Sequence, residues 1–171
     1  MKILDIPQYQ YKKIEITIKE KSCCFTGHRK IRKNELNLVQ LRLKEIITQL
    51  IQTNVTIFIC GGALGFDTLA ALEVLEQKKD NKNIQLIMAL PCKEQCKNWK
   101  EKDQAIYKNI LQKADKIICV SEEYSKYCML ERNRYMVDNS SYCICYLRYS
   151  KSGTAYTVNY AKNNNSILIY I

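Results

Sequence analysis

The chain has 171 residues, of which 47% are hydrophobic and 26% are charged, a composition typical of one folded domain rather than of a disordered, collagenous or coiled-coil chain. Lysine and arginine outnumber aspartate and glutamate by 27 to 17, and the resulting net charge of +10 favours anionic partners without choosing among them. Because no apolar run reaches the roughly 20 residues of a membrane span and no signal-peptide pattern opens the sequence, we expect a cytoplasmic protein without a membrane partner.

The nine cysteines follow neither a disulfide nor a zinc pattern. Their number is odd and no C-x-x-C pair occurs. Several fall inside apolar runs, where a reduced cysteine behaves as a small buried hydrophobe. We therefore predict no metal site and no cofactor.

Short apolar runs alternate with stretches of helical spacing, as in the stretch from Leu36 to Leu50, whose apolar residues recur every three or four positions. In chain order the predicted elements are strand 22–26, helix 35–52, strand 55–60, helix 66–79, strand 84–90, helix 103–113, strand 116–120, helix 130–139, strand 142–147, helix 153–163 and strand 166–171.

Strands of nearly continuous apolar character, each followed by a helix, are typical of a parallel sheet covered on both faces. With right-handed crossovers they predict a Rossmann-like three-layer α/β sandwich with a mainly parallel sheet. Residues 14–18 alternate apolar and polar side chains and are a candidate N-terminal edge strand. We predict an N-terminal extension at 1–21 and a single domain at 22–171.

All five glycines follow predicted strands: Gly27, Gly61, Gly62, Gly65 and Gly153. Ligands of open parallel sheets bind outside the carboxyl ends of the strands, where glycine allows close backbone approach and helix N-termini offer amides to phosphate. For each glycine taken alone, an ordinary role in a turn is the alternative to ligand binding. Their concentration at one edge predicts a phosphate-binding edge.

Polar side chains accompany these glycines. His28, the only histidine, and Arg29, a forked donor suited to phosphate, follow the first strand. Asp67 falls in the first turn of a predicted helix. Its side chain has two alternative roles there, capping the helix and binding a ribose hydroxyl. The loop at 61–67 is neither a Walker A nor a G-x-G-x-x-G sequence.

Five segments taken in order resemble the YpsA-like family, part of the superfamily that unites the DNA-processing protein DprA with the LOG nucleotide hydrolases: residues 23–29, 61–67, 91–99, 132–138 and 153–161. The resemblance covers residues 22–171. It implies a Rossmann-like domain that binds a nucleotide or a nucleotide-derived ligand, and a protein that self-associates as a homo-oligomer.

Carried over by motif, the implied ligand-binding residues are Gly27, Arg29, Gly61, Gly62, Asp67, Arg132, Asn133, Gly153 and Thr154, and His28 joins them from the first loop.

The LOG hydrolases carry a Pro-Gly-Gly-x-Gly-Thr-x-x-Glu motif, and Thr157 stands where their catalytic glutamate would be. A threonine cannot replace a carboxylate in proton transfer or in stabilising an oxocarbenium ion. We therefore expect a binding module, a ligand sensor or a sequestering protein, rather than an enzyme. Two alternatives stay open: a hydrolase of N-glycosidic or phosphoester bonds that uses Asp67 or Glu131, and DprA-like binding of single-stranded DNA.

Overall fold

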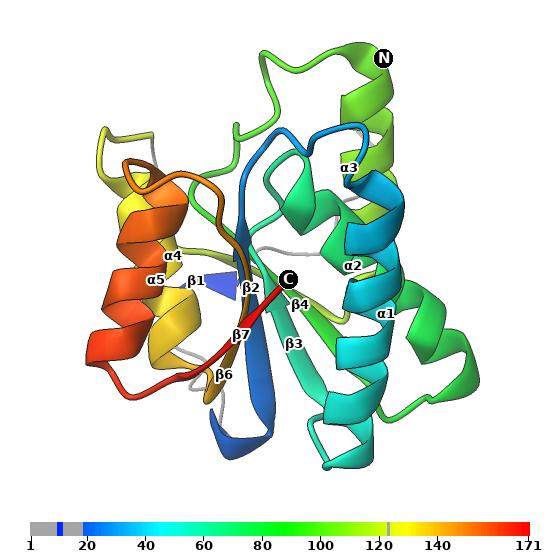
Figure 1. Ribbon diagram of the computed structural model, residues 1–171. Coiled ribbons are helices and arrows are strands. Elements are labelled where there is room, and N and C mark those ends of the chain that lie inside the picture. Colours follow the sequence, from blue (N-terminus) through cyan, green and yellow to red (C-terminus); the bar gives the residue numbers. More distant parts are fainter. Residues whose placement is uncertain (1–9, 12–18, 123) are drawn as a thin grey trace.

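The computed structural model describes residues 10–11, 19–122 and 124–171, which form an α/β fold around one parallel sheet (Figure 1). Within these residues the sheet has seven strands in the order β1-β5-β4-β3-β2-β6-β7, and every neighbouring pair is parallel. The strands are β1 (Gln10–Tyr11), β2 (Ser22–Gly27), β3 (Ile57–Cys60), β4 (Gln85–Leu90), β5 (Lys116–Cys119), β6 (Tyr142–Tyr146) and β7 (Ile167–Tyr170). The helices are η1 (Lys19–Lys21), α1 (Leu36–Gln52), α2 (Phe66–Asp80), α3 (Glu101–Lys113), α4 (Cys128–Asp138) and α5 (Gly153–Asn163).

Helices α1, α2 and α3 cover one face of the sheet, and α4 and α5 cover the other (Figure 1). Alternate residues of a strand enter the two hydrophobic cores: Phe58 and Cys60 pack under α1–α3, whereas Ile59 packs under α4 and α5. These three layers confirm the predicted Rossmann-like sandwich. None of the helices in the described residues is long and apolar enough to cross a membrane.

Element boundaries differ from the predictions where local hydrogen bonds take over. Strand β3 begins at Ile57 rather than at residue 55. Residues 53–55 instead close helix α1: Asn54 has a φ of 71°, and the amide of Val55 donates to the carbonyl of Leu50 at 3.0 Å. The edge strand predicted at 14–18 lies outside the described residues.

The strand order reverses at β2, and this reversal determines where a ligand can bind. From β2 the chain moves outward through β3, β4 and β5, then returns to place β6 and β7 on the other side of β2. In open α/β sheets the crevice at such a switch point, outside the carboxyl ends of the strands, is the usual ligand position. The loops after β2, β3 and β6 border that crevice.

Gly65 fixes how two of these loops meet. Its φ is 77°, and a Cβ there would lie 2.3 Å from the carbonyl oxygen of Arg29.

We predict that Gly65→Ala lowers the free energy of unfolding by about 1–3 kcal/mol in chemical denaturation. Gly153→Ala is the matched control, because a Cβ at Gly153 would have no atom within 4 Å. Equal stability of the two variants would contradict this role of Gly65.

Candidate ligand-binding site

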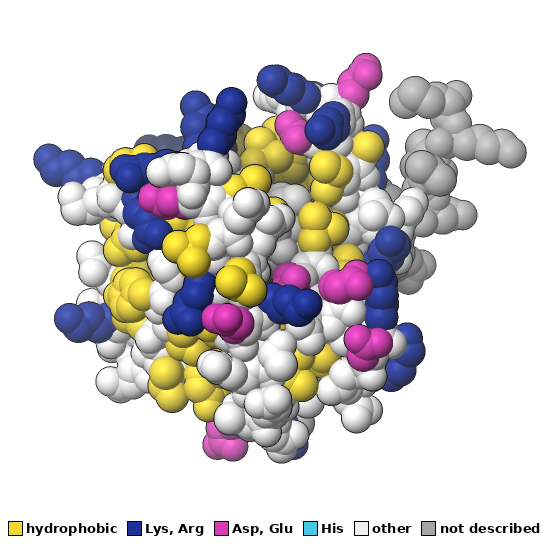
Figure 2. Space-filling model, turned by 45° about the vertical axis from the view of Figure 1, so that its right-hand side comes forward, with side chains coloured by type: hydrophobic (Ala, Val, Ile, Leu, Met, Phe, Trp, Pro, Cys, Tyr) yellow, Lys and Arg dark blue, Asp and Glu magenta, His cyan; other side chains and the backbone are white. Residues whose placement is uncertain are grey.

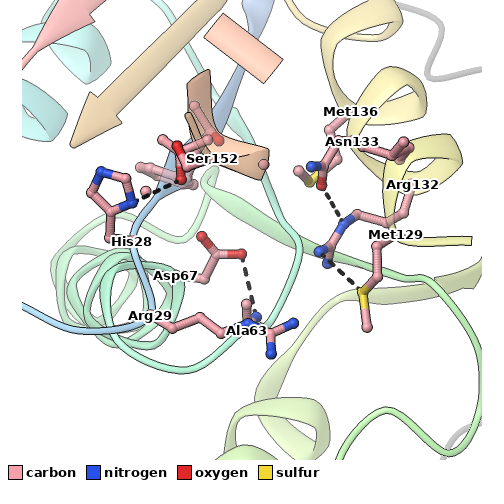
Figure 3. Close-up of a pocket in the computed structure, with 15 residues that line it drawn as sticks. His28, Arg29, Ala63, Asp67, Met129, Arg132, Asn133, Met136 and Ser152 are labelled. Carbon is pink, nitrogen blue, oxygen red and sulfur yellow. Dashed lines mark hydrogen bonds between the residues drawn. The ribbon is translucent and has the colours of Figure 1, made fainter. Parts of the chain in front are cut away.

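A cavity of about 340 Å³ opens at the carboxyl edge of the sheet, between the loops after β2, β3 and β6 and helix α4 (Figure 3). Its volume is in the range of small-molecule sites. Eight of the ten residues expected to bind ligand line it: Gly27, His28, Arg29, Asp67, Arg132, Asn133, Gly153 and Thr154.

Gly61 and Gly62 do not line the cavity but support its floor. The Gly61 carbonyl accepts hydrogen bonds from the guanidinium of Arg132 and, at 3.2 Å, from the amide of Gln95. Gly62 packs toward Met88 and Tyr107 in the core. These two glycines therefore allow close packing within the protein rather than close approach of a ligand.

Gly153 is the glycine with open space around it. Of the five glycines, all of which the structure describes, only this one would place a Cβ with no atom within 4 Å. It begins helix α5, after the N-cap residue Ser152, whose hydroxyl accepts a hydrogen bond from the amide of Ala155 at 3.0 Å. First-turn amides have no intrahelical acceptor, and the first two residues of this helix, Gly153 and Thr154, line the cavity.

His28 joins two loops and carries no charge. Its Nε2 accepts hydrogen bonds from the backbone amides of Arg148, at 2.8 Å, and Tyr149, at 3.3 Å, so this nitrogen holds no proton. Its Nδ1 faces the hydroxyl of Thr154 at 3.4 Å. Burial, and then the nearby Arg148, lower the pKa of the imidazole. The ring contacts Thr154 and supplies no cation.

Asp67 is the buried carboxylate of the site, with 4% of its surface exposed. One carboxylate oxygen accepts from the amide of Ala63 at 3.3 Å, and Figure 3 shows the other oxygen turned away from Ala63. Burial raises the pKa of Asp67 to about 6, although the charges of Arg132 and Arg29 and the Ala63 hydrogen bond oppose the rise. Asp67 thus accepts a hydrogen bond within the protein and also lines the cavity.

Arg132, one of the residues expected to bind ligand, forms its hydrogen bonds within the protein. Only 4% exposed, its guanidinium donates to the carbonyl of Gly61 and, at 2.8 Å, to the amide oxygen of Asn133. It also lies 3.5 Å from the carbonyl of Ala89. Burial lowers the pKa of Arg132, and the neighbouring Asp67 opposes that shift. This arginine is a fixed positive charge in the wall, whereas Arg29 is exposed at the opening.

Thr157 occupies the interface between α4 and α5 rather than the cavity. It is 1% exposed, accepts from the amide of Asn133 at 2.8 Å and donates to the carbonyl of Gly153 at 2.9 Å. Glu131 is exposed and accepts from the hydroxyl of Ser121 at 3.0 Å, outside the cavity. Among the described residues, Asp67 is therefore the one carboxylate that lines the cavity.

Several lining residues were not among the ten predicted to bind ligand. Ser152 carried a readable signal, because a serine directly before a helix is a typical N-cap. Met129, Leu130 and Met136 carried none, since apolar residues at helical spacing are read as core. In Figure 3 the α4 residues Met129, Arg132 and Asn133 face Asp67 and His28 across the cavity.

The fold and the site together define a Rossmann-like α/β protein with a cavity at the switch point of its sheet. The model of the YspA SLOG family (YpsA) matches residues 23–170, and the chain belongs to this family. It is 38% identical over 143 residues to the SPbeta prophage-derived protein YoqJ of Bacillus subtilis, covering 74% of this chain and 84% of YoqJ. A UPF0398 protein of Brevibacillus brevis is 29% identical over 107 residues, which cover 61% of this chain and 57% of that protein.

Two solved structures of DNA processing protein A share the fold. The protein from Helicobacter pylori, described for its single-stranded DNA binding mode, superimposes with a TM-score of 0.65 at 20% identity over 87% of this chain. The protein from Streptococcus pneumoniae gives a TM-score of 0.62 at 15% identity over 87% of this chain. The matched region spans 64% and 49% of those chains, less than two thirds of either.

The raised pKa of Asp67 predicts a pH-dependent stability. Between pH 6 and the ordinary carboxyl pKa of 3.8, the folded protein holds a proton at Asp67 that the unfolded chain lacks. As pH falls through this window, wild type should therefore gain up to roughly 3 kcal/mol of unfolding free energy relative to Asp67→Asn. Urea denaturation of both proteins at a series of pH values measures the difference, and a difference independent of pH would contradict a raised pKa.

Proposed function

We propose that this protein binds a nucleotide or a nucleotide-derived ligand in the cavity and acts as a sensor or as a sequestering protein. One observation supports the proposal most directly: a single cavity of about 340 Å³ combines a helix N-terminus with open space before it, an exposed arginine and a buried carboxylate. These groups match the parts of a nucleotide.

The phosphate would lie at the start of α5. The amides at Gly153 and Thr154 and the dipole of the helix favour an anion there. Arg29 is exposed at the opening and supplies the charge-assisted hydrogen bonds that phosphate prefers. His28, neutral and bonded to the loop before α5, holds Thr154 in place for this contact.

The sugar and the base would lie deeper in the cavity. An ionised carboxylate accepts hydrogen bonds at both oxygens and donates none, and a pKa of about 6 leaves Asp67 mostly ionised at neutral pH, ready to accept from ribose hydroxyls. Met129, Leu130 and Met136 form an apolar wall from α4. Methionine sulfur makes favourable contacts with aromatic rings, which suits the face of a base.

Single-stranded DNA is the second candidate, favoured by the net charge of +10 and by the fold shared with DNA processing protein A. Phosphate contacts along a strand release counterions, so such binding weakens steeply with salt. A nucleotide enclosed by the cavity should lose far less affinity.

The test is a titration of the full chain with nucleoside monophosphates and diphosphates, ADP-ribose and a single-stranded oligonucleotide, each at low and high salt, with chromatography of every mixture afterwards. Salt-tolerant binding of a nucleotide that is recovered intact supports the proposal. A chemically changed nucleotide would identify a hydrolase with Asp67 as its candidate acid–base residue. Binding of the oligonucleotide alone, abolished by salt, would overturn the cavity assignment.

We expect Arg29→Ala to weaken nucleotide binding by about 1.5–3 kcal/mol, the value of hydrogen bonds to charged groups. Lys30→Ala is the matched control, because Lys30 is the adjacent exposed cation and does not line the cavity. Calorimetric titration of both variants separates a specific contact from general charge attraction, which the two substitutions would weaken equally.

A side chain at position 153 should fill the space that a phosphate needs. Gly153→Leu is expected to abolish nucleotide binding and to leave the melting temperature near that of wild type, because no atom lies within 4 Å of its Cβ. Asn159→Leu, at an exposed position on the same helix, is the control that adds the same side chain away from the cavity. Unimpaired binding by Gly153→Leu would place the ligand elsewhere.

A further inference from the structure

A hollow lies between α2 and α3, at the opposite end of α2 from the cavity. Its volume is about 360 Å³, and its lining includes two leucines and four lysines: Leu72, Leu75, Lys78, Lys79, Lys82 and Lys113. Asp67, which lines the cavity, lies in the first turn of α2, whereas Lys78 and Lys79 lie in the last turn. The 15 residues of α2 span roughly 20 Å, so the hollow and the cavity are separate places on the molecule.

Leucines form the apolar part of this hollow. Leu72 is 38% exposed, and Leu75 is half-buried and packs against the core. Figure 2 shows the side of the molecule that carries α1 and α2, where hydrophobic side chains lie at the surface between basic and acidic ones. Exposed apolar surface of this kind, surrounded by charge, is typical of protein–protein contacts.

Lysines give the hollow a positive charge that the described residues neutralise only in part. Two of the four lysines form ion pairs within the protein, and these pairs are Lys78–Asp115 and Lys79–Glu76. The other two, Lys82 and Lys113, are exposed and form no ion pair with any residue that the structure describes. Two cations at the hollow are therefore available to the carboxylates of a partner.

The leucines and the lysines together indicate the chemistry of the occupant. Lysines near the C-terminal ends of helices interact favourably with the helix dipole, but this role requires no exposed leucines beside them. A nucleic-acid backbone would pair with the lysines and would bring no apolar side chains to the leucines. A peptide that carries both carboxylates and apolar side chains is complementary to both parts of the hollow at once.

We propose that the hollow between α2 and α3 binds an acidic segment of a partner protein, with its apolar side chains on the two leucines and its carboxylates at Lys82 and Lys113. The described residues that line this hollow and those that line the cavity do not overlap, so this inference is independent of the proposed function. Burial of apolar surface supplies the affinity, and the two lysines without ion pairs fix the position of the segment.

Fluorescence anisotropy of the full chain with a labelled peptide of alternating glutamate and leucine tests the binding. We expect saturable binding of this peptide. A peptide with serine in place of leucine, and one with glutamine in place of glutamate, should each bind roughly tenfold more weakly or worse, because each lacks one of the two complementary contacts. Absence of saturable binding, or equal binding of the three peptides, would overturn the proposal.

Charge reversal locates the binding on the molecule. The double variant Lys82→Glu/Lys113→Glu should weaken binding of the glutamate–leucine peptide roughly tenfold or more, because it places like charges opposite the peptide. Lys30→Glu/Lys162→Glu is the matched control, since it changes the net charge equally at two exposed lysines outside the hollow, one of them also in the last turn of a helix. Circular dichroism checks that both variants are folded. Equal weakening in the two variants would mean general charge attraction and would overturn the assignment to this hollow.

Leu72→Asn tests the apolar contact and should weaken binding of the peptide roughly fivefold or more. Leu38→Asn is its control, because Leu38 is a more exposed leucine, on α1, that does not line the hollow. A single-stranded oligonucleotide is titrated in parallel. If Lys82→Glu/Lys113→Glu weakens binding of the oligonucleotide while Leu72→Asn leaves the affinity for the peptide unchanged, the hollow is a nucleic-acid surface and the proposal of a protein partner fails.

Discussion

A series of four hydrogen bonds, one buried and three partly buried, runs from the end of β3 to the start of α5 and is the constraint on which the cavity depends. The Gly61 carbonyl accepts from Arg132, Arg132 donates to Asn133, Asn133 donates to Thr157, and Thr157 donates to the carbonyl of Gly153. A buried guanidinium costs several kcal/mol of desolvation unless its donors are satisfied. Arg132 is therefore held to the Gly61 carbonyl and to the side chain of Asn133. These bonds join the wall that faces Asp67 to the loop after β3 and to the start of α5.

This series of hydrogen bonds also explains the electrostatics of the site. Arg132 is committed to backbone and amide oxygens, and its charge offsets only part of the desolvation of Asp67, whose pKa stays raised at about 6. Two charged groups are thus buried at a cost in stability. Such a cost persists where an ionisable group serves a ligand or a reaction, and it supports the proposal that a ligand binds in the cavity.

The sequence predicted the layers and the edge of the sheet because both follow from local patterns: apolar runs for strands, helical periodicity and glycines after strands. It could not predict which polar groups would form hydrogen bonds within the protein. Arg132 bonds to a residue 71 positions away, and the His28 ring bonds to an amide 120 positions away. Both looked available to a ligand until the fold placed their partners beside them. Gly153 could not be told from Gly61 or Gly65 because the distinction is the space around the Cα, which only tertiary packing defines.

Helix α2 begins at the cavity, and the anchoring of its first turn determines where Asp67 lies. Its first turn is held by the amide of Phe66, which donates to the carbonyl of His28 at 3.2 Å, and by the bond from Ala63 to Asp67. A displacement of α2 would therefore break contacts that shape the cavity, because the same turn holds the loop after β2 and the carboxylate of Asp67.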